Sequence, residues 1–118
     1  MDYRYQNGNT MRIYGDHCQI LPDEEAYYAD FLLALCDSID MQQLTDPVVV
    51  TYINFEDELD NGITGTLCIT TSHLSLHSWL LLGGIRCVVD SCKGFDPEIV
   101  IEMVRNWFHP KFITNSVS

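Results

Sequence analysis

The sequence has few basic side chains and no long apolar run. Only 6 of its 118 residues are Lys or Arg, against 17 Asp and Glu, which gives a formal net charge of -11. Proteins that bind nucleic acid through its phosphates need a basic surface, so this composition argues against such a partner. No stretch approaches the ~20 apolar residues of a membrane span, and residues 1–15 lack the apolar centre of a signal peptide. We therefore expect a soluble cytoplasmic protein without a membrane or nucleic-acid partner.

The cysteines lack the arrangement that a disulfide framework or a zinc site requires. There are 5 of them, an odd number, and no two form a C-x-x-C pair. Most lie inside apolar segments, which favours buried thiols over bridges or metal ligands. We therefore expect no metal site. Separately, the excess of Asp and Glu over Lys and Arg would attract a small cationic substrate.

A single domain spanning residues 1–118 suits a chain of this length, because 47% hydrophobic residues can bury one modest core. Apolar residues recur at helical spacing from Asp23 to Ile39 and again after Asp96-Pro97, a typical helix start. Alternating or β-branched segments predict strands at 11–14, 48–55, 65–70, 74–79, 85–91 and 111–114. The short connections favour an α+β fold, a two-layer α/β sandwich with an antiparallel sheet and two helices on one face.

Reactive side chains concentrate in residues 70–79, which read Thr-Thr-Ser-His-Leu-Ser-Leu-His-Ser-Trp. A serine hydrolase would need a glycine-flanked elbow, which Ser72 lacks. A cysteine hydrolase could use Cys92 with His77, but the spacing supplies neither an orienting residue nor an oxyanion hole. A metal site at His73 and His77 has no carboxylate partner nearby. Each of these general chemistries is therefore weakly supported.

Two sequence motifs support a more specific hypothesis. The run Ser-His-Leu-Ser-Leu-His-Ser-Trp at 72–79 is followed, 15 residues after His77, by Cys92 at the end of Val-Asp-Ser-Cys. The run Gly-Ile-Thr-Gly at 62–65 precedes them. In order and spacing these residues resemble the pyruvoyl-dependent prokaryotic S-adenosylmethionine decarboxylase proenzymes, and the likeness extends from about Met11 to Phe112.

This resemblance implies that the chain cuts itself between Thr71 and Ser72, giving a β chain of residues 1–71 and an α chain of residues 72–118. Ser72 would become a pyruvoyl group, the cofactor, which forms a Schiff base with the substrate amine and draws electrons as CO₂ leaves.

The resemblance also assigns roles to individual residues. His77 would be the acid/base of the processing reaction, and Thr64 would hydrogen-bond its intermediate. Cys92 would return a proton to the substrate. Trp79 is the candidate for stacking on adenine, and Phe55 is a second candidate substrate contact.

The implied function is decarboxylation of S-adenosylmethionine in polyamine and spermidine biosynthesis, by a homodimer with its sites near the interface. Two departures from the family pattern keep alternatives open: Thr71 replaces a usual Glu, and Leu80-Leu81 replaces Pro-Glu, which removes a carboxylate from the substrate site. One alternative is a relative that decarboxylates another amine, such as ornithine or arginine. The other is an unprocessed, non-catalytic binding homologue.

Overall fold

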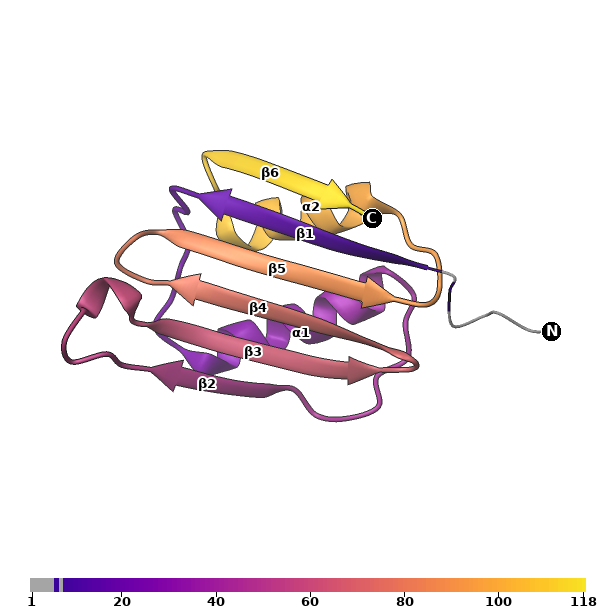
Figure 1. The fold of residues 1–118 in the computed structure, drawn as a ribbon, viewed down its shortest axis with the longest axis horizontal. Helices are drawn as coiled ribbons and strands as arrows, with labels where there is room; N and C mark the ends of the chain where they lie inside the picture. Colours follow the sequence, from indigo (N-terminus) through magenta and orange to yellow (C-terminus); the bar gives the residue numbers. More distant parts are fainter. Residues whose placement is uncertain (1–5, 7) are drawn as a thin grey trace.

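One antiparallel sheet of six strands, backed by two helices, makes up the fold (Figure 1). The computed structural model describes residue 6 and residues 8–118. The strands are β1 (Asn9–Asp16), β2 (Val48–Tyr52), β3 (Gly62–Ile69), β4 (Ser72–Trp79), β5 (Gly84–Ser91) and β6 (Phe112–Val117). They lie in the order β2-β3-β4-β5-β1-β6, and every neighbouring pair is antiparallel. The predicted α+β sandwich is confirmed.

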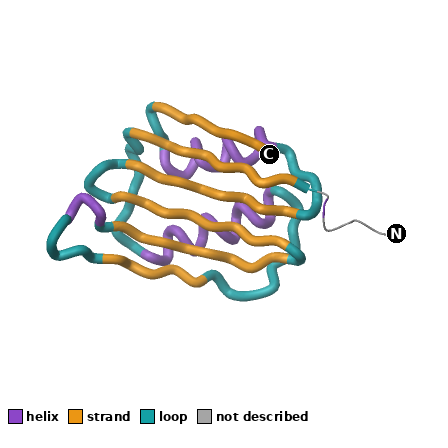
Figure 2. Tube along the Cα trace, viewed as in Figure 1, coloured by secondary structure: helices purple, strands orange, loops and turns teal. Residues whose placement is uncertain are grey.

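Both helices cover the same face of the sheet, as Figure 2 shows. Helix α1 (Glu25–Ser38) packs on β2, β3 and β4, and α2 (Pro97–Phe108) packs on β1. The predicted start of α2 is confirmed, since the Asp96 carboxylate accepts a hydrogen bond from the Glu98 N–H at 3.0 Å. The core between the layers includes Tyr28, Phe31, Leu32, Leu35, Leu67, Leu74, Leu76, Val100, Val104 and Phe108. No helix among the described residues is long and apolar enough to cross a membrane.

The opposite face of the sheet carries no helix, and alternation along each strand decides what it displays. In β4, Leu74 and Leu76 are buried against the helices, whereas His77 and Trp79 are half-buried on the uncovered face. These two residues therefore share one face of the sheet. Figure 1 views the sheet from this uncovered side.

Several predicted boundaries were wrong. Strand β1 spans Asn9–Asp16 instead of 11–14. Strand β2 ends at Tyr52 instead of residue 55, because the Asn54 side chain forms a turn: its Oδ1 accepts hydrogen bonds from the backbone N–H groups of Glu56 and Asp57. Strand β3 begins at Gly62, where a Cβ would stand 1.7 Å from the Ser78 carbonyl oxygen. Only glycine fits this close approach, so here glycine belongs to a strand.

Candidate active site

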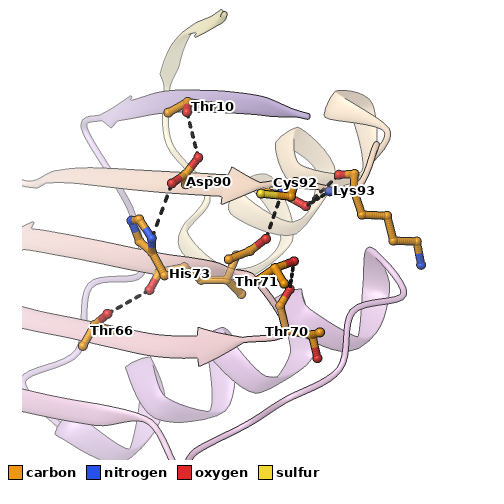
Figure 3. Close-up of polar contacts among 11 residues, drawn as sticks. Thr10, Thr66, Thr70, Thr71, His73, Asp90, Cys92 and Lys93 are labelled. Carbon is orange, nitrogen blue, oxygen red and sulfur yellow. Dashed lines mark hydrogen bonds and ion pairs between the residues drawn. The ribbon is translucent and has the colours of Figure 1, made fainter. Parts of the chain in front are cut away.

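Ser72 and Cys92 come together at one end of the sheet. Ser72 is the first residue of β4, directly after the two-residue turn formed by Thr70 and Thr71. Strands β4 and β5 pair with His73 opposite Asp90, which places the end of β5 beside the start of β4. The backbone N–H of Cys92 donates a hydrogen bond to Ser72 Oγ at 3.0 Å (Figure 3). We call these two half-buried residues the serine–cysteine cluster.

Hollows border this cluster and the turn before it. One of about 250 Å³ is lined by Thr10, Asp90, Cys92 and Ser118, among others. Another of about 270 Å³ borders Thr71. A larger hollow of about 520 Å³ lies elsewhere, beside helix α2, and none of the candidate catalytic residues lines it. Of the residues that the sequence singled out, Cys92 lines the first of the smaller hollows and Thr71 the second.

The residue before Ser72 has an unusual backbone conformation. Thr71 is exposed and has a φ of 57°, in the left-handed region that favours glycine and asparagine. Its hydroxyl donates to the Thr70 carbonyl oxygen at 2.7 Å (Figure 3). The bond that the sequence predicts to be cut therefore follows a strained residue in an exposed turn.

Thr64 and His77 form a second pair, across β3 and β4. They are register partners, and Thr64 Oγ1 lies 3.0 Å from His77 Nδ1. Burial lowers the pKa of His77 below its ordinary value of 6.5, and the positive charge of Arg86 on β5 lowers it further. The imidazole is therefore neutral at pH 7 and able to accept a proton. We call these residues the threonine–histidine pair.

The two groups lie far apart within one chain. Ser72 and His77 are five residues apart in a continuous strand, which separates them by about 17 Å at about 3.4 Å per residue. Their odd spacing also points the side chains to opposite faces of the sheet. The structure therefore brings Ser72 to Cys92 and Thr64 to His77, but it does not bring His77 to Ser72.

The two candidate substrate contacts have different surroundings. The Trp79 ring centroid lies 6.2 Å from that of His77, and Trp79 lines a hollow of about 350 Å³ with Tyr14 and Phe112. Phe55 is 95% exposed, between β2 and the short 3-10 helix η2 (Glu58–Asp60). Trp79 is thus beside the threonine–histidine pair, whereas Phe55 lines none of the hollows described above.

The sequence analysis missed three polar residues on the uncovered face. Thr10 Oγ1 donates to Asp90 Oδ1 at 2.9 Å, and Asp90 Oδ2 lies 3.6 Å from His73 Nδ1 (Figure 3). Arg86 has a buried Nε without a hydrogen-bond partner among the described residues. The sequence signal for Arg86 and Asp90 was the presence of charged residues on one face of an apolar strand, since the two are four residues apart in β5.

His73 and His77 are four residues apart in β4, so about 14 Å of strand separates them and they do not ligate one metal ion.

Comparison with known proteins agrees with the motif and the fold. The family profile described as S-adenosylmethionine decarboxylase matches residues 11–117. The S-adenosylmethionine decarboxylase proenzyme of Thermomicrobium roseum is 32% identical over 88 residues, covering 64% of this chain and 76% of that protein. The crystal structure of the adenosylmethionine decarboxylase from Aquifex aeolicus superposes with a TM-score of 0.65 at 18% identity, covering 95% of this chain and 90% of that one. The chain therefore belongs to the S-adenosylmethionine decarboxylase family.

Proposed function

We propose that this protein is a self-processing, pyruvoyl-dependent S-adenosylmethionine decarboxylase of polyamine biosynthesis. One observation carries the proposal: the serine that would be converted into the cofactor receives a 3.0 Å hydrogen bond from the backbone of the cysteine that would donate the proton. Family membership supplies the reaction class. The geometry adds that both residues meet at an exposed turn, where the chain can be cut without loss of a buried element.

Processing begins with attack of Ser72 Oγ on the carbonyl carbon of Thr71. The new C–O bond replaces the C–N bond, and the hydroxyl proton ends on the freed nitrogen, so the peptide becomes an ester without any added reagent. A base then removes the Cα proton of residue 72 while the Cβ–O bond breaks, which releases the Thr71 carboxylate. Water then displaces the nitrogen from the Cα of residue 72, the nitrogen leaves as ammonia, and a pyruvoyl group remains at residue 72.

The surroundings of residue 72 fit this group. The Cys92 N–H that now binds Ser72 Oγ is a donor for an oxygen at this position. A pyruvoyl carbonyl supplies the electron sink for loss of CO₂ from an α-amino acid. The half-buried Cys92 thiol is the adjacent group that can return a proton to the substrate α-carbon.

The base for processing that the resemblance names, His77, is too distant to act on Ser72 within one chain. The neutral imidazole of His77 has the right chemistry, but about 17 Å of its own strand separates it from Ser72. We propose that a second copy supplies it, through a dimer that brings the partner's His77 to the exposed turn before Ser72. In a two-fold dimer each copy would contribute its serine–cysteine cluster to one site and its threonine–histidine pair to the other.

The exposed leucines after Trp79 support a second candidate substrate class. Leu81 is 60% exposed at the position where the resemblance places a carboxylate, and Leu82 is 57% exposed. An apolar wall does not accept hydrogen bonds from a ribose, so an amino acid without a nucleoside, such as ornithine or arginine, is the alternative.

Mass measurement of the purified protein tests the processing, and release of labelled CO₂ tests the substrate. We expect the 13.5 kDa chain to convert on incubation into fragments of residues 1–71 and 72–118. The processed protein should then release CO₂ from carboxyl-labelled S-adenosylmethionine. A chain that stays intact would identify a non-catalytic homologue. Cleavage with CO₂ release only from ornithine or arginine would assign the alternative substrate.

Mixed dimers test the shared site. A Ser72→Ala chain keeps its threonine–histidine pair, and a His77→Ala chain keeps its serine–cysteine cluster. We expect neither variant to process alone, whereas co-expression should cut the His77→Ala chain only. Absence of cleavage in the mixture, with mixed dimers demonstrated by differently sized tags, would defeat the shared site while leaving wild-type processing untouched.

A further inference from the structure

Thr71 is the unusual residue of the scissile turn. Four residues other than glycine have a positive φ in the described part of the chain: His17, Asp40, Thr71 and His109. Thr71 is the β-branched member of this group, and branching at Cβ makes the left-handed region particularly unfavourable. Asp and His tolerate that region better, so strain is greatest at the residue that donates its carbonyl to the proposed cleavage.

The contacts on either side explain why the turn keeps this conformation. Ile69 and Ser72 are the last register partners of β3 and β4, so two residues must close the hairpin. The Thr70 N–H donates to the Gln42 carbonyl oxygen at 3.0 Å, which holds the turn from one side. The Cys92 N–H holds Ser72 Oγ from the other side. Both flanks are anchored, so the turn cannot relax by moving as a whole.

We propose that Thr71 is a positioning residue whose strained backbone accelerates self-cleavage, a role that rests on the processing reaction proposed above. When Ser72 Oγ replaces the nitrogen on the Thr71 carbonyl carbon, the chain path through residue 72 loses its nitrogen and gains Oγ and Cβ, so it lengthens by one atom. The two-residue turn becomes longer and Thr71 is free to leave the left-handed region. Strain that is present in the intact turn and released along the reaction lowers the barrier to cleavage. For strain of this kind the cleavage rate rises by about 5- to 150-fold.

Glycine at position 71 relieves the strain, and a neighbouring substitution provides the control. Thr71→Gly should process about 5- to 150-fold more slowly than the wild type. Thr70→Gly adds the same flexibility at a turn position without a positive φ, and Thr71→Val keeps the branched Cβ while losing the hydroxyl. Both controls should process within about threefold of the wild type. The measurement is the first-order loss of the intact chain by mass spectrometry.

Stability gives a second readout that does not depend on cleavage. A Ser72→Ala background cannot process and loses the Ser72 Oγ contact in both variants alike, while the two-residue closure of the hairpin and the Thr70–Gln42 hydrogen bond do not involve that side chain. In this background Thr71→Gly should raise the urea midpoint of unfolding relative to Thr70→Gly. The proposal is overturned if Thr71→Gly processes as fast as Thr70→Gly, or if it is the less stable of the two. If the wild-type chain never cuts, the proposed function fails and the catalytic role of Thr71 fails with it, while the comparison of stability still tells whether the turn is strained.

Discussion

Removal of the Thr64 hydroxyl tests the threonine–histidine pair with little change in shape. Thr64→Val keeps the branched side chain that suits strand β3, but it deletes the oxygen that lies 3.0 Å from His77 Nδ1. Thr64 is half-buried, so the pair is partly shielded from water. We expect Thr64→Val to fold and to process more slowly, because the imidazole loses its cross-strand partner.

The size of the effect tells which role the hydroxyl has. A hydrogen bond that only orients the imidazole contributes about 0.5–1.5 kcal/mol, which corresponds to about 2- to 12-fold in rate. A hydroxyl that also donates to the charge developing on the Thr71 carbonyl oxygen contributes about 2.7–4 kcal/mol, or about 100- to 1000-fold. The 3.0 Å contact with His77 occupies the hydroxyl in the intact chain, so we expect the smaller effect.

The assay is the time course of cleavage for the wild type, Thr64→Val and Thr64→Ser at pH 7. Serine keeps the oxygen and should process within about threefold of the wild type. Urea unfolding in a Ser72→Ala background shows whether each variant is folded. Wild-type cleavage by folded Thr64→Val would refute a role for the hydroxyl, and equally slow cleavage by both variants would trace the effect to packing.

Three further predictions concern charge, proton transfer and stability. Burial, and to a lesser extent the charge of Arg86, lower the pKa of His77. Arg86→Met should therefore raise that pKa and shift the acid limb of the pH–rate profile of processing to higher pH, whereas Arg86→Lys should leave it in place. The same acid limb in the wild type and both variants would contradict this. Cys92→Ala should still cut itself but lose about 100-fold or more in CO₂ release, and full turnover would exclude the cysteine as proton donor. Asp96→Ala should lower the urea-derived free energy of unfolding by about 1 kcal/mol, because α2 loses its cap, and should leave processing unchanged; a defect in processing would show that α2 affects the site.

The fold could be predicted because its elements are encoded locally. Asp96 and Pro97 mark a helix start that needs no tertiary information, and α2 begins there. Leu74 and Leu76 alternate with polar residues, which sets the two faces of β4. The start of β3 was predicted wrongly because a distant contact decides it. Gly62 looks like the end of a turn in the sequence, but it lies in a strand because the backbone of Ser78 passes too close for any side chain.

The site was only partly predictable, and the reasons differ between residues. The predicted strand began at residue 74, so the sequence did not place Ser72 and His77 on opposite faces; that follows from the observed start of β4 at Ser72. The contact of Thr10 with Asp90 joins residues 80 positions apart and depends on the pairing of β1 with β5. The positive φ of Thr71 depends on the register of the hairpin, which no local preference of threonine indicates.

Division of the site between two copies would make assembly a condition for activation. A single folded chain holds Ser72 beside Cys92 but keeps its own His77 about 17 Å away, so His77 does not reach the bond to be cut within that chain. In the proposed dimer that base arrives only when the two copies associate. Cleavage would then occur only after folding and association, and the Thr71–Ser72 bond would stay intact until the partner's His77 completes the site. Processing of freshly folded chains should consequently slow on dilution below the dissociation constant of the dimer, whereas a base within the same chain would make the rate independent of concentration.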